Sequence, residues 1–284
     1  MSSRRFEAIG TEWDIETERP ITAEVAQAID TRIALFDKTY SRFRDDSLIT
    51  AIAKKAGEYT FPADAKALFA FYQIIYKATK GKLTPLVGAL LEASGYDAQY
   101  NLRQTGPLQT PPELFAVARF KENILTTTSP QLFDFGAAGK GYLADIIGDI
   151  LSANGHDSYI IDASGDIVCK GASQRIGLED PRDNTRVIGV VEIKNQSICA
   201  SAANRRAWGD NLHHIFDPQK RQPVRDIIAT WAIAKNGLEA DGLATALFFT
   251  DPQVLQKSFQ FAYVRMRENG EVDYSENFKG EIFG

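Results

Sequence analysis

The sequence is poor in cysteine and histidine, with two cysteines and three histidines among 284 residues. Cys169 and Cys199 do not form a CxxC pair, so the chain carries neither a cysteine-based zinc motif nor a disulfide framework. Two interpretations of the pair are left, a single Cys169–Cys199 bridge or two buried thiols. The thiols are favoured, because free cysteine behaves as a small buried hydrophobe.

Long apolar runs and basic clusters are also missing. No window approaches the ~18 consecutive apolar residues of a transmembrane helix, and the start MSSRRFEAIGTEW lacks the apolar segment of a signal peptide or lipoprotein leader. We therefore expect a soluble cytoplasmic protein, or an exported or membrane-associated one whose leader has been removed. Acidic and basic residues are interleaved, with a net charge of -5, so nucleic acid is not an expected partner.

Helical and alternating patterns fall in different parts of the chain. With 44% apolar residues and no linker, we expect one domain over 1–284, in one or two lobes. Helical spacing predicts helices over 23–38, 63–79, 84–93, 140–154, 240–249 and 254–259, with Thr22 capping the first and Ser47 a further short helix. Strands are predicted in 4–18, 115–128, 158–163, 167–170, 174–178, 186–193, 197–201, 229–234 and 261–266. This separation favours an α+β fold, with antiparallel sheets flanked by helices.

The stretch FDFGAAGKGYLADII, residues 133–147, predicts a strand, a glycine- and alanine-rich turn and a helix. A helix N-terminus beside Lys140 attracts an anion, most often a phosphate, because the first amide groups of a helix are unpaired. The alternative is an ordinary strand–turn–helix with Lys140 in solvent. This stretch alone supports both interpretations equally.

Asp241 and Thr245 lie four residues apart in ADGLATALFFT, which places them on one face of a predicted helix. Their oxygens could bind Mg²⁺, which a phosphate site at Lys140 would require. The alternative, which the segment by itself favours, is that Asp241 caps its own helix and Thr245 bonds to the preceding turn.

The three histidines are His156, His213 and His214. His213 and His214 precede IFDP, and only one of two strand neighbours can point into a given site. A histidine there could take the proton of a hydroxyl nucleophile, whereas the alternative is a surface pair. His156 is expected to be a solvated helix cap. The turn-bounded strands in 165–171 and 177–183 carry no obvious catalytic groups and are expected to be scaffold.

Seven segments, in this order, resemble the ApbE-type flavin transferases, or FAD:protein FMN transferases. They are IGTEWDIE, YSRFRDDSLI, DFGAAGKGYLAD, SGDIVCKG, GLEDPR, HHIFDP and ADGLATALF, and together they span Gly10 to Phe248. The resemblance implies an ApbE/T-fold-like architecture and a Mg²⁺-dependent cleavage of FAD. In that reaction FMN passes to a Thr or Ser hydroxyl of an acceptor protein, and AMP is released.

The resemblance also implies roles for individual residues. Ala137 would offer a backbone carbonyl to the metal, and Asp241 and Thr245 would offer side-chain oxygens. Lys140 would contact FAD, and His214 would be the base for the acceptor hydroxyl.

Other positions would line the FAD site. Asp134 would contact FAD, and Phe43 occupies the place of a tyrosine that stacks on the flavin or adenine. Ile9 stands where a methionine lines the pocket. Leu83 and Thr84 replace a Phe-Asp pair, which removes a carboxylate contact to FAD.

Three further departures distinguish this chain from the family pattern. Ser201-Ala202 replaces a Ser-Gly pair of the family, Ser164-Gly165 replaces a Gly-Gly pair, and Arg221 replaces a glycine. The departures affect FAD binding more than the metal site, because the metal positions are kept.

The segment DGLAT, residues 241–245, is similar to the acceptor motif of the family, in which an Asp and a spacer precede Ser/Thr-Ala-Thr. Leu243 stands where that motif has Ser or Thr, so we interpret the segment as a metal-binding helix. Two alternatives to transfer are an FAD pyrophosphatase that yields FMN and AMP, and a non-catalytic FAD-binding carrier.

Overall fold

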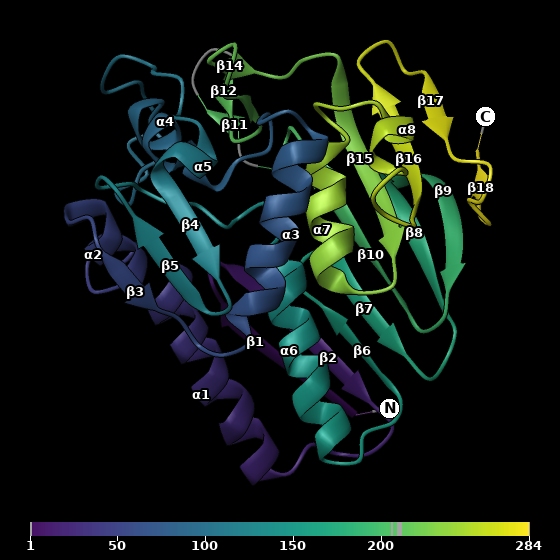
Figure 1. The fold of residues 1–284 in the computed structure, drawn as a ribbon. Coiled ribbons are helices and arrows are strands. Elements are labelled where there is room, and N and C mark those ends of the chain that lie inside the picture. The colour runs from purple at the N-terminus through teal and green to yellow at the C-terminus, as the bar shows by residue number, and fades with distance from the viewer. Residues whose placement is uncertain (1, 206, 209–211, 284) are drawn as a thin grey trace.

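The computed structural model describes residues 2–205, 207–208 and 212–283, and its centre is a large antiparallel sheet (Figure 1). The sheet has eight strands in the order β1-β2-β6-β7-β10-β15-β16-β17. The strands are β1 (Ser2–Ala8), β2 (Thr11–Thr17), β6 (Tyr159–Asp162), β7 (Asp166–Lys170), β10 (Gln196–Ala202), β15 (Ile227–Ala234), β16 (Ala262–Arg267) and β17 (Val272–Tyr274). Each pairs antiparallel with its neighbours.

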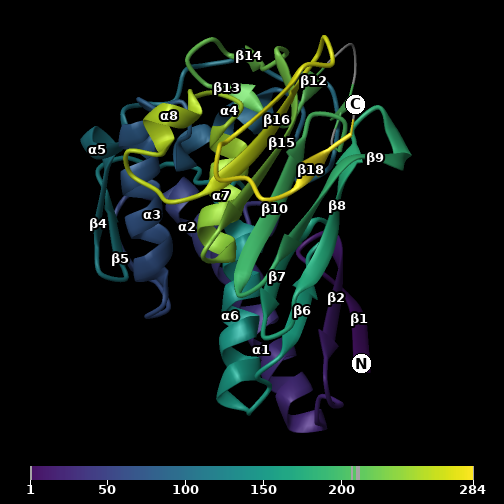
Figure 2. The same cartoon turned by 90° about the vertical axis from the view of Figure 1, so that its right-hand side faces the viewer.

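Helices cover one face of this sheet (Figure 2). The helices of that layer are α1 (Ala23–Tyr40), α6 (Gly139–Ala153) and α7 (Gly237–Ala246). Side chains alternate between the two faces of a strand, so Ile161 and Cys199 pack into the core that contains these helices. Their neighbours Ile160 and Ile198 face a second core on the opposite side.

The second core is closed by a long hairpin. Its strands, β8 (Gln174–Asp180) and β9 (Asp183–Ile193), pair with β18 (Glu281–Ile282) in a 3-stranded sheet. Leu178 and Val191 of the hairpin are buried against the large sheet. The hairpin therefore protects the face that the helices leave uncovered.

Shorter elements extend the helical side. The helices are α2 (Leu48–Lys54), α3 (Ala65–Ala78), the 3₁₀ turn η1 (Pro85–Val87), α4 (Gly88–Ala93), α5 (Leu114–Val117) and α8 (Pro252–Leu255). A small sheet has the order β3-β5-β4, from β3 (Glu58–Thr60), β4 (Ala118–Lys121) and β5 (Ile124–Thr127). Two ribbons complete the fold, β11 (Ala207–Trp208) with β12 (Leu212–His213), and β13 (Phe216–Asp217) with β14 (Gln222–Pro223).

These elements confirm the α+β prediction with antiparallel sheets. Thr22 accepts a hydrogen bond from the Val25 amide and Ser47 accepts one from the Thr50 amide, so both predicted N-caps are present. Cys169 and Cys199 are buried free thiols, not a disulfide. Among the residues that the structure describes, no helix is both long and apolar enough to span a membrane.

The strand predicted at Phe133–Phe135 is wrong. This segment has no regular secondary structure and belongs to no sheet of the described chain. Its Asp134 amide donates instead to the carbonyl of Pro85, the first residue of η1, at 2.7 Å. An apolar run needs a neighbouring strand to become part of a sheet, and here the Asp134 amide is paired with a 3₁₀ turn.

Other boundaries also differ from the prediction. The residues before Ala118 form the helical turn α5 rather than a strand. Helix α7 begins at Gly237 with Asn236 as its N-cap, so Asp241 does not cap its own helix. Helix α8 ends at Leu255, earlier than predicted.

The turn of the β13–β14 ribbon explains one departure from the family pattern. Arg221, which stands for a glycine, has φ 57°, in the left-handed region that costs a non-glycine residue about 1–2 kcal/mol. Its amide donates to the Asp217 carbonyl at 2.8 Å, which closes the turn. The backbone conformation suited to glycine is therefore kept although the residue has changed.

We expect Arg221→Gly to raise the free energy of unfolding by about 0.5–1 kcal/mol, because the relief of the left-handed strain exceeds the extra entropy of glycine in the unfolded chain. Thermal or urea unfolding measures this. Arg221→Ala is the matched control, since alanine removes the side chain but retains the strain. Equal stabilisation by both variants would contradict the backbone explanation.

Candidate functional site

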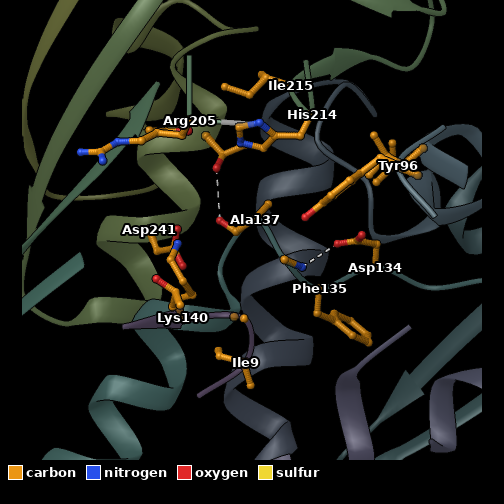
Figure 3. Close-up of a pocket in the computed structure, with 18 of the residues that line it drawn as sticks. Ile9, Tyr96, Asp134, Phe135, Ala137, Lys140, Arg205, His214, Ile215 and Asp241 are labelled. Carbon is orange, nitrogen blue, oxygen red and sulfur yellow. Dashed lines mark hydrogen bonds between the residues drawn. The ribbon is translucent and has the colours of Figure 1, made fainter. Parts of the chain in front are cut away.

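One cavity of about 670 Å³ lies between the end of α1, the turn before α6, the start of the β13–β14 ribbon and α7. Every site residue singled out from the sequence lines it: Ile9, Phe43, Leu83, Thr84, Asp134, Ala137, Lys140, His214, Asp241 and Thr245. Figure 3 shows Lys140 and Asp241 on one side, Tyr96 and Asp134 on the other, and His214 on the far side of Ala137 from Ile9. The roles of these residues stay predictions.

The wall beside Lys140 is the crossing of α6 and α7. A Cβ atom on Gly141 would lie 2.1 Å from the Gly237 carbonyl oxygen, and one on Gly237 would lie 2.4 Å from the Gly141 carbonyl oxygen. Any side chain at either position would separate the two helices. This pair of glycines therefore sets how close the helices come.

Each helix also caps the N-terminus of the other. Asp241 of α7 accepts a hydrogen bond from the Gly141 amide at 3.0 Å. Asp145 of α6 accepts bonds from the Gly237 and Leu238 amides at 2.7 and 2.8 Å. Both carboxylates thus bind unpaired amides at the positive end of a helix. The first amides of α6 are consequently less available to an anion than the sequence predicts.

Burial opposes the charge on both capping carboxylates. It raises the pKa of Asp145 to about 6, although two backbone amides favour the ionised form. Burial also raises the pKa of Asp241. The nearby Asp166 carboxylate raises this pKa further, whereas Lys140 lowers it. Burial disfavours the charged form unless an opposite charge is close, so the Asp241 side of the cavity favours a cation.

A donor set for that cation is present next to Asp241. The Thr245 hydroxyl donates to the Ala137 carbonyl at 3.3 Å, which joins two of the three residues predicted as metal ligands. The third, Asp241, lies one turn before Thr245 on α7. Of the two carboxylate oxygens of the buried Asp166, Oδ2 forms an ion pair with Lys140, and Oδ1 has no hydrogen-bond partner among the described residues. Carboxylate, hydroxyl and carbonyl oxygens suit Mg²⁺. No group of three or more His, Cys, Asp or Glu side chains forms a metal site in the described chain, so waters or substrate would complete the coordination.

Asp166 is a site residue that the sequence analysis missed. Lys140 Nζ lies 2.5 Å from Asp166 Oδ2, and the Asp166 side chain is 1% exposed. Strand β7, which was expected to be scaffold, thus supplies the partner of Lys140. The two residues are far apart in the sequence, so no local pattern predicts that they pair. The signal in the sequence was the acidic residue within SGDIVCKG.

Asp134 has a different environment from the one predicted. Arg42 Nε donates to Asp134 Oδ2 at 2.5 Å, and the Gly136 amide donates to Oδ1 at 2.7 Å. Each oxygen thus has one partner within the protein, and Asp134 holds the turn that presents Ala137. A carboxylate can accept further hydrogen bonds, so the direct contact between Asp134 and FAD stays a prediction.

Aromatic rings form the opposite wall. The Arg42 guanidinium lies 4.1 Å from the ring centre of Phe43 and 4.9 Å from that of Tyr96. Phe43 also stacks on Tyr100, with ring centres 5.8 Å apart. The wall offers flat surfaces suited to an aromatic ring system. Tyr96 and Tyr100 were missed because they lie in a turn-rich segment with no periodic pattern.

The remaining predicted lining positions have structural roles of their own. Ile9 occupies the β1–β2 turn with φ 46°. Thr84 accepts a hydrogen bond from the Leu86 amide at 3.2 Å and caps η1. Leu83 is buried beside it. The pair that replaces Phe-Asp thus maintains the local backbone and lines the cavity without a charge.

The three histidines have different environments, and one of them lines the cavity. His213 Nε2 lies 2.7 Å from the Val224 carbonyl oxygen, and burial lowers the pKa of His213. His214 follows the last residue of β12 and lines the cavity, which His213 does not. His156 is buried, with 4% exposure, so its prediction as a solvated cap is wrong.

The hairpin that carries GLEDPR also reaches the cavity. Glu179 and Pro181 line it, and Glu179 forms an ion pair with Arg205 at 2.9 Å. The segment 177–183, expected to be scaffold, thus also contributes to the cavity wall. Figure 3 shows Arg205 on the His214 side of the cavity, so this ion pair lies on that side.

Together, the fold and this cavity define an α+β protein whose large cavity has aromatic rings on one side and charged groups on the other. The model of the ApbE family matches residues 9–263, and the chain belongs to that family. The family predicted from the seven segments is thus confirmed.

Known proteins similar to this chain agree with that assignment. The FAD:protein FMN transferase of Klebsiella pneumoniae (strain 342) is 24% identical over 290 residues, covering 92% of this chain and 79% of the relative. That of Treponema pallidum (strain Nichols) is 26% identical, covering 82% and 74%. The crystal structure of the ApbE protein from Thermotoga maritima has a TM-score of 0.85 at 23% identity, and covers 98% of both chains. The flavin transferase ApbE from Vibrio cholerae has a TM-score of 0.82 at 20% identity, with the same coverage.

We expect Gly141→Ala to lower the free energy of unfolding by at least about 2 kcal/mol, because the new methyl group would force α6 and α7 apart. Chemical denaturation measures the loss. Gly139→Ala is the matched control on the same helix, since its Cβ would meet only Phe36 Cζ at 4.0 Å. Equal losses in the two variants would show that the helix crossing is not the cause.

Proposed function

We propose that this protein transfers the FMN moiety of FAD to a Ser or Thr hydroxyl of an acceptor protein and releases AMP, with Mg²⁺ bound at Ala137, Asp241 and Thr245. The observation that carries the proposal is the hydrogen bond from Thr245 to the Ala137 carbonyl, near the buried Asp241 and in the cavity that His214 also lines. The relatives named FAD:protein FMN transferase support the same reaction.

The walls of the cavity suit the two halves of FAD. Phe43, Tyr96 and Tyr100 offer ring surfaces for a flavin or an adenine. Lys140 offers a positive charge for the pyrophosphate, on the same side as the oxygen donors. Mg²⁺ at those donors would neutralise charge on the phosphates as it develops. Aromatic and charged walls on opposite sides orient a dinucleotide in one direction.

The transfer requires one nucleophile and one leaving group. His214 takes the proton of the acceptor hydroxyl, and the oxygen attacks the phosphorus on the riboflavin side of FAD. The bond from that phosphorus to the bridging oxygen breaks, and AMP leaves with the bridging oxygen. Lys140 offsets negative charge on the pyrophosphate during this step. The product is a phosphoester between FMN and the acceptor side chain.

Incubation with FAD, Mg²⁺ and a domain that carries the acceptor motif tests this function. We expect intact mass spectrometry to show the acceptor gaining one FMN less a water molecule, and chromatography to show an equal amount of AMP. FMN and AMP formed without acceptor modification would instead support an FAD pyrophosphatase. Bound FAD that is not cleaved with any divalent ion would support a carrier.

We expect Asp241→Ala to abolish Mg²⁺-dependent AMP release and Asp241→Asn to lower it by about 100-fold or more, because metal stabilisation of phosphate charge is worth several kcal/mol. Asparagine keeps an oxygen for the Gly141 amide, so it separates the lost charge from the lost cap. Mg²⁺ affinity from calorimetry should fall in both variants.

Thr245→Ser and Thr245→Val form the matched pair for the second ligand. Serine keeps the hydroxyl, whereas valine keeps the shape and loses the oxygen. Unchanged AMP release in Asp241→Ala, or equal Mg²⁺ affinity in the two Thr245 variants, would contradict the proposed metal site.

A further inference from the structure

A second hollow adjoins the cavity, and we call it the basic groove. Its volume is about 450 Å³, and it lies between the β13–β14 ribbon and the segment after α7. The residues that line it are Lys82, Asp217, Lys220, Gln222, Pro223, Val224, Arg225, Asp226, Phe248 and Phe249. None of the roles assigned to the cavity accounts for it.

The charges of the basic groove do not cancel. Asp226 is paired with Arg267 at 2.6 Å. Asp217 is buried, and one of its carboxylate oxygens accepts the amides of the turn that follows it. Lys220 and Arg225 are exposed and form no ion pair with the described residues. A chain with a net charge of -5 thus presents a local positive surface here, which attracts acidic partners.

The basic groove is continuous with the cavity. Lys82 and Phe249 line both hollows, and Lys82 Nζ donates to the Phe249 carbonyl at 3.2 Å. Phe249 follows the proposed metal ligand Thr245 by four residues. The groove therefore opens close to the proposed metal.

The other wall of the basic groove is connected to the proposed base. The Val224 carbonyl lies 2.7 Å from His213 Nε2, and His213 directly precedes His214. The Val224 amide donates to the Ile215 carbonyl at 3.0 Å. A chain bound along the groove would thus pass beside the segment that carries His214.

We propose that the basic groove binds an acidic stretch of the acceptor protein beside the hydroxyl that receives FMN. The inference rests on the proposed function and names the chemistry of its partner. Lys220 and Arg225 would pair with carboxylates, while Pro223, Phe248 and Phe249 would contact apolar side chains. A polypeptide fits better than a second part of FAD, because the cavity already contains aromatic surfaces and a lysine for the dinucleotide.

Charge reversal tests this partner. The probes are two fluorescently labelled peptides with one threonine each, flanked by aspartates in one and by asparagines in the other. In the FAD-loaded protein at low ionic strength, we expect the aspartate peptide to bind more tightly. The double variant Lys220→Glu/Arg225→Glu should weaken its binding by about tenfold or more, since each exposed charge pair contributes up to about fivefold. The asparagine peptide should be little affected.

Lys194→Glu, in an exposed turn after β9, is the matched control with a single equal charge change, and it should keep the preference for aspartate. FAD affinity of the double variant, from flavin fluorescence, should stay within about twofold. Equal binding of the two peptides, a preference that survives the double reversal, or a loss of FAD affinity would overturn the proposal. These binding results do not depend on FMN transfer, so failure of the wild-type transfer assay would reject the proposed function separately.

Discussion

The site depends on the crossing of α6 and α7 at Gly141 and Gly237. Each helix has a glycine at the contact and an aspartate four residues later, and each aspartate caps the partner helix at its glycine. The aspartates can reach across only because the glycines let the backbones touch. The same contact that joins the helices therefore brings Asp241 beside Lys140 and places Thr245 against Ala137.

This arrangement gives Asp241 two tasks with opposite demands. As a cap it accepts the Gly141 amide, and as a buried carboxylate beside Asp166 it is costly to ionise. When Asp241 and Asp166 are both ionised, Lys140 offsets one of their two negative charges, and one negative charge is left without a counter-charge. The proposed divalent cation would more than offset that charge, and the oxygens of Ala137 and Thr245 are its other proposed ligands. Stability and the proposed metal binding would thus be coupled at one residue.

Features that depend on residues close in the sequence could be predicted, whereas contacts between distant residues could not. The spacing of Asp241 and Thr245, the caps at Thr22 and Ser47 and the turn before Lys140 all follow from short-range geometry. The pairs Arg42–Asp134 and Lys140–Asp166 join residues far apart in the chain. The Gly-x-x-x-Asp pattern occurs in both helices, yet its meaning appears only when the two helices meet. The error at Phe133–Phe135 has the same origin, because an extended run does not reveal whether a partner strand exists.

The departures from the family pattern change side chains more than backbone. Ser164 and Arg221 both adopt left-handed conformations, φ 55° and 57°, in places where the resemblance implies glycine. Leu83-Thr84 keeps a helical cap while it removes a carboxylate. The backbone at Ser164 and Arg221 thus keeps a conformation suited to glycine, at the cost of local strain. On the aromatic side, the change to Leu83-Thr84 removes a polar contact. Arg42, held by Asp134 and stacked on Phe43, is a buried charge on that side. Recognition of the ring system would consequently depend on stacking more than on hydrogen bonds, while the phosphate side keeps its charged groups.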